Sequence, residues 1–251
     1  MNAKGATVPA ESEPGLRVPP RTIPVPTSVS AEAQAYLASP GLSSGPYPPS
    51  GDLAGWRVYV TSMDAQLFAH LAHINSDGAE VEHITVDGGG EVFTITPPNV
   101  IPGDRRVYLD IHGGALIVGG GRSCRITGII SAIRYGLPTW AVDYRMPPDH
   151  PYPAGLDDCV AAYRALLETH EPGEIVIGGT SAGGNLAAAL ILRARDEGLP
   201  LPAAALLLTP QLDLTESGDT FATNMGVDLA ATRSLMPAHL VYAGGRDYEL
   251  L

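Results

Sequence analysis

The pentapeptide GTSAG at residues 179–183 has the spacing of a nucleophilic serine. A serine in a G-x-S-x-G pattern occupies a strained turn between a strand and a helix, where only small neighbours such as Gly179 and Gly183 avoid a clash. A β-rich run at 174–177 precedes the pentapeptide and an Ala- and Leu-rich run follows it. That turn places the Ser181 hydroxyl at a helix N-terminus, where free N–H groups favour developing negative charge. The pattern predicts that Ser181 attacks a carbonyl carbon.

A second motif, His112-Gly113-Gly114, follows a strand-like run upstream of the serine. Glycines let the backbone approach a ligand closely and turn its N–H groups toward an oxyanion. We expect the amides of Gly113 and Gly114, together with that of Ala182, to form an oxyanion hole, with His112 orienting or packing the loop. A phosphate-binding loop would need the G-x-x-x-x-G-K-[ST] pattern, which is absent, and the single lysine of the chain is Lys4.

The segments around these motifs alternate between strand-like and helix-like patterns, which predicts an α/β fold with a mostly parallel sheet and helices on both faces. A hairpin with a glycine-rich turn at 87–90 opens the sheet. Upstream, Ser30 caps a short helix over 31–37, and an amphipathic helix begins at Asp52 and ends at Gly78. The expected strands are 81–86, 91–96, 106–111, 138–142, 174–178 and 203–208, and the expected helices after the hairpin are 123–135, 156–169 and 182–195.

Composition excludes several classes of partner. The formal net charge of −12 repels polyanions, so no nucleic acid partner is expected. No apolar run reaches the ~20 residues that a membrane span needs. The N-terminal segment has no apolar run typical of a secretion signal before residue 30, so we expect a cytoplasmic protein. Cys124 and Cys159 lack the spacing of a metal site or a disulfide framework, so they are expected to be buried, with no metal and no cofactor.

Three motifs in one order carry a family resemblance: the HGG element, the segment DYRMPPDHPYPA at 143–154, and GTSAGGNLA from residue 179. Together they resemble the bacterial hormone-sensitive-lipase family of esterases, with Thr180 and Ala115 as departures from its commonest form. The resemblance implies an α/β-hydrolase fold, short-chain carboxylic esters as substrates and no cofactor. It also implies a helical cap.

The expected organisation follows from that cap. Residues 1–50 are an N-terminal arm and cap segment, 51–214 the hydrolase core, and 215–251 a cap insertion. Within the middle motif we expect His150 to hold the loop around Arg145 by packing or hydrogen bonding.

The catalytic partners of Ser181 are expected downstream in the order acid, then histidine. The one histidine downstream of Ser181 is His239, which lies in a stretch that we expect to belong to the cap. An alternative makes 239–243 a seventh strand and Asp247 the acid, but still supplies no later histidine. We therefore expect a truncated chain with an incomplete triad and negligible esterase activity by itself, and a sheet edge that favours homo-oligomers or strand exchange. A non-catalytic binder of small molecules on the same fold is the alternative function.

Overall fold

The computed structural model describes residues 22–39, 45–74, 77–224 and 233–246. It divides into two compact units, residues 1–41 and 42–251. In the first unit, helix α1 (Ala31–Leu37) begins after Ser30, whose hydroxyl accepts a hydrogen bond from the Ala33 amide at 3.2 Å. The predicted helix and its cap are therefore confirmed.

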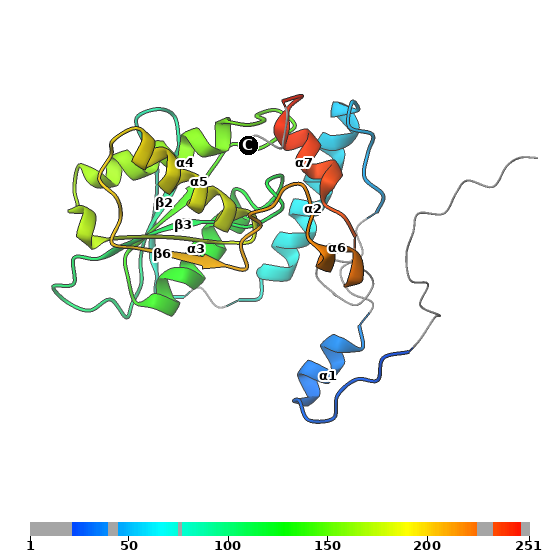
Figure 1. Cartoon of the computed structure of the whole chain (residues 1–251). Helices are drawn as coiled ribbons and strands as arrows, with labels where there is room; N and C mark the ends of the chain where they lie inside the picture. Colours follow the sequence, from blue (N-terminus) through cyan, green and yellow to red (C-terminus); the bar gives the residue numbers. More distant parts are fainter. Residues whose placement is uncertain (1–21, 40–44, 75–76, 225–232, 247–251) are drawn as a thin grey trace, which may run out of the picture. The chain divides into compact units, whose positions relative to one another are not determined.

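The second unit has the predicted alternation of strands and helices around one sheet (Figure 1). Its strands are β1 (Glu80–Thr85), β2 (Glu91–Thr96), β3 (Val107–Ile111), β4 (Thr139–Asp143), β5 (Ile175–Thr180) and β6 (Ala204–Leu208). Its helices are α2 (Leu53–Leu71), α3 (Arg122–Tyr135), α4 (Ala154–Leu167), the 3-10 turn η1 (Pro172–Glu174), α5 (Ala182–Asp196), α6 (Asp219–Thr223) and α7 (Met236–Ala243).

The sheet has the strand order β1-β2-β4-β3-β5-β6. The β1–β2 and β2–β4 pairs are antiparallel, whereas β4–β3, β3–β5 and β5–β6 are parallel. The β1–β2 hairpin closes with Thr85 opposite Glu91, and Gly88 and Gly89 take positive φ in its turn. Both the hairpin and the mostly parallel sheet are confirmed.

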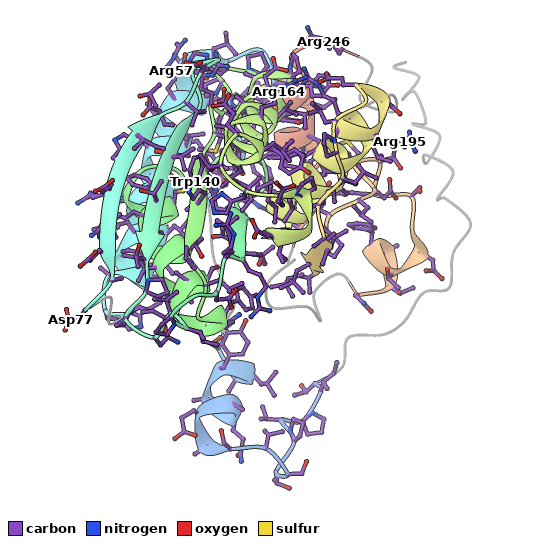
Figure 2. The ribbon with its side chains drawn as sticks, turned by 90° about the vertical axis from the view of Figure 1, so that its left-hand side faces the viewer. Arg57, Asp77, Trp140, Arg164, Arg195 and Arg246 are labelled. Atoms are coloured by element: carbon purple, nitrogen blue, oxygen red, sulfur yellow. The ribbon has the colours of Figure 1, made fainter. Side chains whose placement is uncertain are left out.

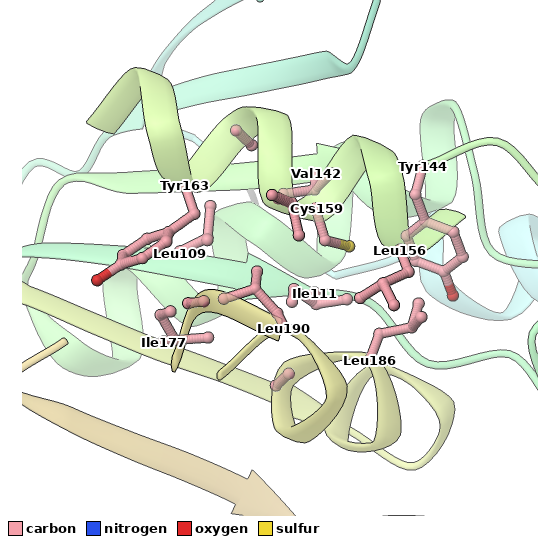
Figure 3. Packing of buried hydrophobic residues seen from close by; sticks show 14 of the residues in the cluster. Leu109, Ile111, Val142, Tyr144, Leu156, Cys159, Tyr163, Ile177, Leu186 and Leu190 are labelled. Carbon is pink, nitrogen blue, oxygen red and sulfur yellow. The ribbon is translucent and has the colours of Figure 1, made fainter. Parts of the chain in front are cut away.

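Helices pack on both faces of the sheet. On one face α4 and α5 lie together over the central strands, and Leu156 and Cys159 of α4 meet Leu186 and Leu190 of α5 (Figure 3). On the other face α3 buries Cys124 and Ile129 against β2 and β4. The central strand β3 is buried along its whole length, so the carboxyl end of a rigid strand positions the HGG motif.

Two helical expectations need correction. Helix α2 starts beside Asp52 as predicted, and the Asp52 carboxylate accepts the Gly55 amide at 2.9 Å, but the helix ends at Leu71 rather than at Gly78. The alternative strand at 239–243 is wrong, because these residues belong to helix α7. Pro237 suits the first turn of that helix, where no N–H is needed, and Gly244 ends it with a φ of 61°.

Several charged side chains on the helices are exposed. Figure 2 shows Arg57 of α2 and Arg195 of α5 at opposite edges of the molecule, and their side chains are 54% and 61% exposed. Among the described helices, none combines the length and the apolar character needed to cross a membrane.

Candidate active site

Ser181 lies at the turn between β5 and α5, as predicted. Its backbone has φ 56° and ψ −119°, a conformation that residues other than glycine rarely adopt. A Cβ at Gly183 would lie 1.9 Å from the carbonyl oxygen of Ile111, and a Cβ at Gly179 would lie 2.4 Å from the backbone of Gly183. The turn can therefore form only with glycine at both positions, because backbone atoms cannot yield as side chains do.

The segment after β6 braces this turn. The Ser181 amide donates to the Leu208 carbonyl at 2.9 Å, and the Gln211 amide donates to the Ser181 carbonyl at 3.1 Å. The side-chain amide of Asn185 donates to the Gln211 carbonyl at 2.9 Å. These bonds hold the strained backbone of Ser181 from both sides, while no described residue forms a hydrogen bond with its hydroxyl.

The HGG loop lies directly against the serine. A Cβ at Gly113 would lie 2.8 Å from the Thr180 carbonyl oxygen and 3.5 Å from the Ser181 Cβ. Within the described chain, the amides of Gly113 and Gly114 have no hydrogen-bond partner. Ala182 is the first residue of α5, where the amide has no carbonyl within the helix. Three predicted oxyanion donors thus lie on segments that meet at Ser181.

His112 is 4% exposed, and its ring stacks on Tyr144 with the centroids 4.1 Å apart. Its Nδ1 lies 2.8 Å from the Gly113 carbonyl oxygen, which can only accept, so Nδ1 carries the proton and donates. Burial lowers the pKa of His112, which keeps the ring neutral. The Nε2 atom is buried with no hydrogen-bond partner among the described residues. The imidazole therefore packs beneath the loop, as expected for an orienting group.

Two aspartates that the sequence did not single out hold the glycines at 119–121. The Gly119 amide donates to Asp64 Oδ1 at 2.7 Å, and the Gly121 amide donates to Asp143 Oδ1 at 2.8 Å. Burial raises the pKa of Asp64. Nothing local marks Asp64 as a residue that binds this loop, because its partner is 55 residues away in the chain.

The loop after β4 is held by Asp158, not by His150. The Asp158 carboxylate is fully buried, accepts the Arg145 backbone amide at 2.8 Å and pairs with the Arg145 guanidinium at 2.7 Å. His150 is exposed. The prediction that His150 holds the loop around Arg145 is therefore wrong. Asp158 on α4 holds this loop instead, because its carboxylate binds Arg145 where the loop passes over the helix.

His239 is fully buried in α7 and is occupied on both ring nitrogens. Nδ1 donates to the Leu214 carbonyl at 2.9 Å, so Nε2 accepts from the Gln211 side-chain amide at 2.5 Å. Burial lowers the pKa of His239. It joins α7 to the segment that braces Ser181, but it forms no hydrogen bond with the Ser181 hydroxyl.

One cavity is formed by segments that follow β6. It encloses about 510 Å³ and is lined by residues of the segments 216–224 and 233–235, including Phe221 and Arg233. Both segments fall within the expected cap insertion. Ser181 is not among the lining residues.

Comparison with known proteins agrees with the fold and the motifs. A family model described as alpha/beta hydrolase fold matches residues 108–248. An acetyl-hydrolase of Streptomyces hygroscopicus is 41% identical over 146 residues, which are 57% of this chain and 49% of that protein. An esterase of Acinetobacter venetianus is 34% identical over 144 residues, 57% of this chain and 46% of that protein. The chain thus spans about half the length of the curated relatives it matches.

Solved structures extend the comparison over more of the chain. Esterase E25 superposes with a TM-score of 0.79 at 30% identity, over 94% of this chain and 74% of its own. An esterase from the bacterial hormone-sensitive lipase family gives a TM-score of 0.66 at 30% identity, over 82% of this chain and 66% of its own. The chain therefore belongs to the hormone-sensitive-lipase family of α/β-hydrolase-fold esterases.

Proposed function

We propose that this protein hydrolyses short-chain carboxylic esters through an acyl-enzyme on Ser181. The Ser181 hydroxyl attacks the ester carbonyl, the alcohol leaves, and water then releases the acid. The amides of Gly113, Gly114 and Ala182 stabilise the oxyanion. The observation that carries the proposal is the meeting of the strained Ser181 turn with the HGG loop, whose Gly113 lies against Thr180 and Ser181.

The family relatives support the reaction class. These relatives are named acetyl-hydrolase, esterase and carboxylesterase. The cap would consist of residues 1–50 and 215–251, with 51–214 as the catalytic core. The cavity lined by segment 216–224 and residues 233–235 lies within this proposed cap and does not include Ser181.

A general base for Ser181 is not supplied by hydrogen bonding within the described residues. His239, the one histidine downstream of the serine, uses both ring nitrogens on Leu214 and Gln211. Removing a triad partner lowers the rate by several orders of magnitude. We therefore propose that the 251-residue chain by itself turns over esters very slowly.

The test compares p-nitrophenyl butyrate hydrolysis by the chain, a Ser181→Ala variant and a Ser62→Ala control, with reaction of each protein with a fluorophosphonate followed by intact mass. We expect little turnover and, because Ser181 lacks a general base, one slowly formed adduct that Ser181→Ala abolishes and Ser62→Ala retains. An adduct on Ser181→Ala would refute the nucleophile. Rapid turnover that depends on Ser181 would refute the incomplete triad and make His239→Ala the next variant.

A non-catalytic binder remains the second candidate, and the unpartnered Ser181 hydroxyl favours it over a fully assembled triad. Such a protein would bind a small ester in a calorimetric titration without forming product. Formation of the fluorophosphonate adduct on Ser181 argues against it, because a pure binder has no need of a reactive serine.

A further inference from the structure

Three potential metal ligands from different parts of the chain meet below the HGG loop. His112 follows β3, Asp143 ends β4, and Cys124 is the third residue of α3. One ligand atom of each residue lies within 4.8 Å of the other two. The three residues, named here the His112 cluster, gather at the carboxyl edge of the parallel strands, where α/β proteins commonly place ligands.

One ring nitrogen of His112 has a free lone pair. Nδ1 donates to the Gly113 carbonyl, so the neutral ring has its lone pair on Nε2. That atom is buried and has no hydrogen-bond partner among the residues described, and His112 as a whole is only 4% exposed. A buried polar atom without a partner is destabilising, because it has lost its hydrogen bonds to water. A ligand that accepts this lone pair would remove that penalty.

Cys124 and Asp143 add the two anionic donors. Cys124 is 1% exposed, and its thiol makes one long contact to the Val142 carbonyl at 3.5 Å. Asp143 uses Oδ1 to accept the Gly121 amide and can offer its other oxygen. A thiolate and a carboxylate together balance the charge of a divalent cation, which matters because an uncompensated charge is costly in a buried site.

We propose that His112, Cys124 and Asp143 bind one thiophilic divalent cation of the zinc class. Imidazole nitrogen, thiolate sulfur and carboxylate oxygen are the ligands that zinc and cobalt take in proteins. Bonds of about 2.3 Å to sulfur and about 2.0–2.2 Å to nitrogen or oxygen keep two ligands of one ion within roughly 4.5 Å. Ligands lie that far apart only on opposite sides of an ion, and a tetrahedral ion spaces them roughly 3.5–3.8 Å apart, so ligand atoms at the 4.8 Å limit of the cluster would close by about 1 Å on binding. On binding, Cys124 forms a sulfur–metal bond and its proton passes to solvent.

The cation would stiffen the loop that carries Gly113 and Gly114. The His112 ring is already held through Nδ1 by the Gly113 carbonyl and by stacking on Tyr144. A metal on Nε2 fixes the ring at its other end, as paired contacts on both nitrogens do in metal sites. This inference goes beyond the proposed esterase function and holds whether or not Ser181 turns over substrate.

The experiment titrates the full chain with Co²⁺ and follows the near-ultraviolet charge-transfer absorption of a cobalt–thiolate bond. Cys124→Ser tests the cluster, and Cys159→Ser is the matched control, because Cys159 is equally buried but lies outside the cluster. Wild type and Cys159→Ser should show the band and Cys124→Ser should lack it. Absence of the band from wild type at millimolar cobalt, or its persistence in Cys124→Ser, would overturn the site.

A second variant separates lost binding from lost folding. Asp143→Asn keeps an oxygen to accept the Gly121 amide but removes the anionic ligand. We expect at least about a tenfold weaker affinity for Co²⁺, since changes around a metal site alone cost that much. Zinc should raise the Tm of wild type and of Cys159→Ser by mass action, and should leave the Tm of Asp143→Asn nearly unchanged at the same concentration. Equal zinc shifts in all three folded proteins would contradict the assignment.

Discussion

At the scale of single residues, the serine turn depends on the absence of side chains. The Cβ that an alanine would add at Gly183 falls 1.9 Å from the Ile111 carbonyl oxygen and 2.7 Å from the His112 carbonyl oxygen. Both contacts are with backbone, so relief requires movement of β3 or of α5. The close approach of α5 to the end of β3, which requires glycine at position 183, also brings the HGG loop to Ser181.

Gly183→Ala should lower the free energy of unfolding by about 3 kcal/mol or more, at the upper end for overpacking. Gly173→Ala is the control, because nothing lies within 4 Å of a Cβ at Gly173. Urea denaturation followed by fluorescence measures both. Equal stability of the two variants would show that the turn can relax.

Asp110 is the second residue with a testable energetic role. Asp110 is the fourth residue of β3 and is 6% exposed. Burial raises the pKa of Asp110 to about 7, although hydrogen bonds with Ser131 and Tyr108 oppose the rise. The folded protein therefore favours the protonated carboxyl, whereas the unfolded chain releases the proton near its ordinary pKa.

The sign of the pH effect follows from that difference. The folded state binds more protons than the unfolded state between about pH 4 and pH 7, so Asp110 lowers the free energy of unfolding as pH rises through this window, by roughly 2–4 kcal/mol. Asp110→Asn should remove that slope relative to wild type, whereas the exposed Asp196→Asn should not. Denaturation midpoints measured across the window check this, and parallel curves for wild type and Asp110→Asn would refute it.

At the scale of elements, the loop between β4 and α4 is fixed by one charged pair. Asp158 is fully buried on α4 and holds both the backbone and the guanidinium of Arg145. The Arg145 side chain is 42% exposed, so solvent screens part of the attraction. Loss of the guanidinium would leave a buried carboxylate with only the backbone amide as partner.

Arg145→Met should therefore lower the free energy of unfolding by about 2–3 kcal/mol, near the low end for a broken buried pair. Arg164→Met is the control. Arg164 lies on α4, the helix that carries Asp158, and pairs with Glu197 at the surface, where the two side chains are 50% and 32% exposed. Figure 2 marks Arg164 on its helix. We expect little change for the control, and a similarly small change for Arg145→Met would show that the pair adds nothing.

At the scale of the whole molecule, strand β6 forms one edge of the described sheet. It pairs with β5 alone among the described strands, and Ala204 and Ala205 are exposed on it. Leu201 and Leu212 on either side are 48% and 58% exposed. Unpaired strand edges with apolar neighbours favour association between copies.

We expect the 251-residue chain to self-associate in a concentration-dependent way, as measured by light scattering after size separation. Ala205→Lys should reduce this association, because a lysine on an edge strand opposes pairing. Ala69→Lys on the exposed face of α2 adds the same charge elsewhere and should not reduce it. A monomer at all concentrations, or equal effects of the two lysines, would refute an edge-mediated contact.

The sequence by itself determined the order of elements through β6, the hairpin, the Ser30 cap of α1, and the positions of the GTSAG and HGG motifs. These depend on local chemistry: turn glycines, a capping serine, and alternating apolar periods act within a few residues. Ser181 is located by the same logic, since its turn needs only its own neighbours to be small.

The tertiary structure decided which distant groups meet. It brought Asp158 rather than His150 to Arg145, Asp64 to Gly119, and Gln211 to His239. It also gathered the His112 cluster, whose ligands lie on separate segments of the chain. No spacing rule encodes such pairs, because the strand order that places β3 between β4 and β5 is fixed by packing across the whole sheet, not by the residues beside each motif.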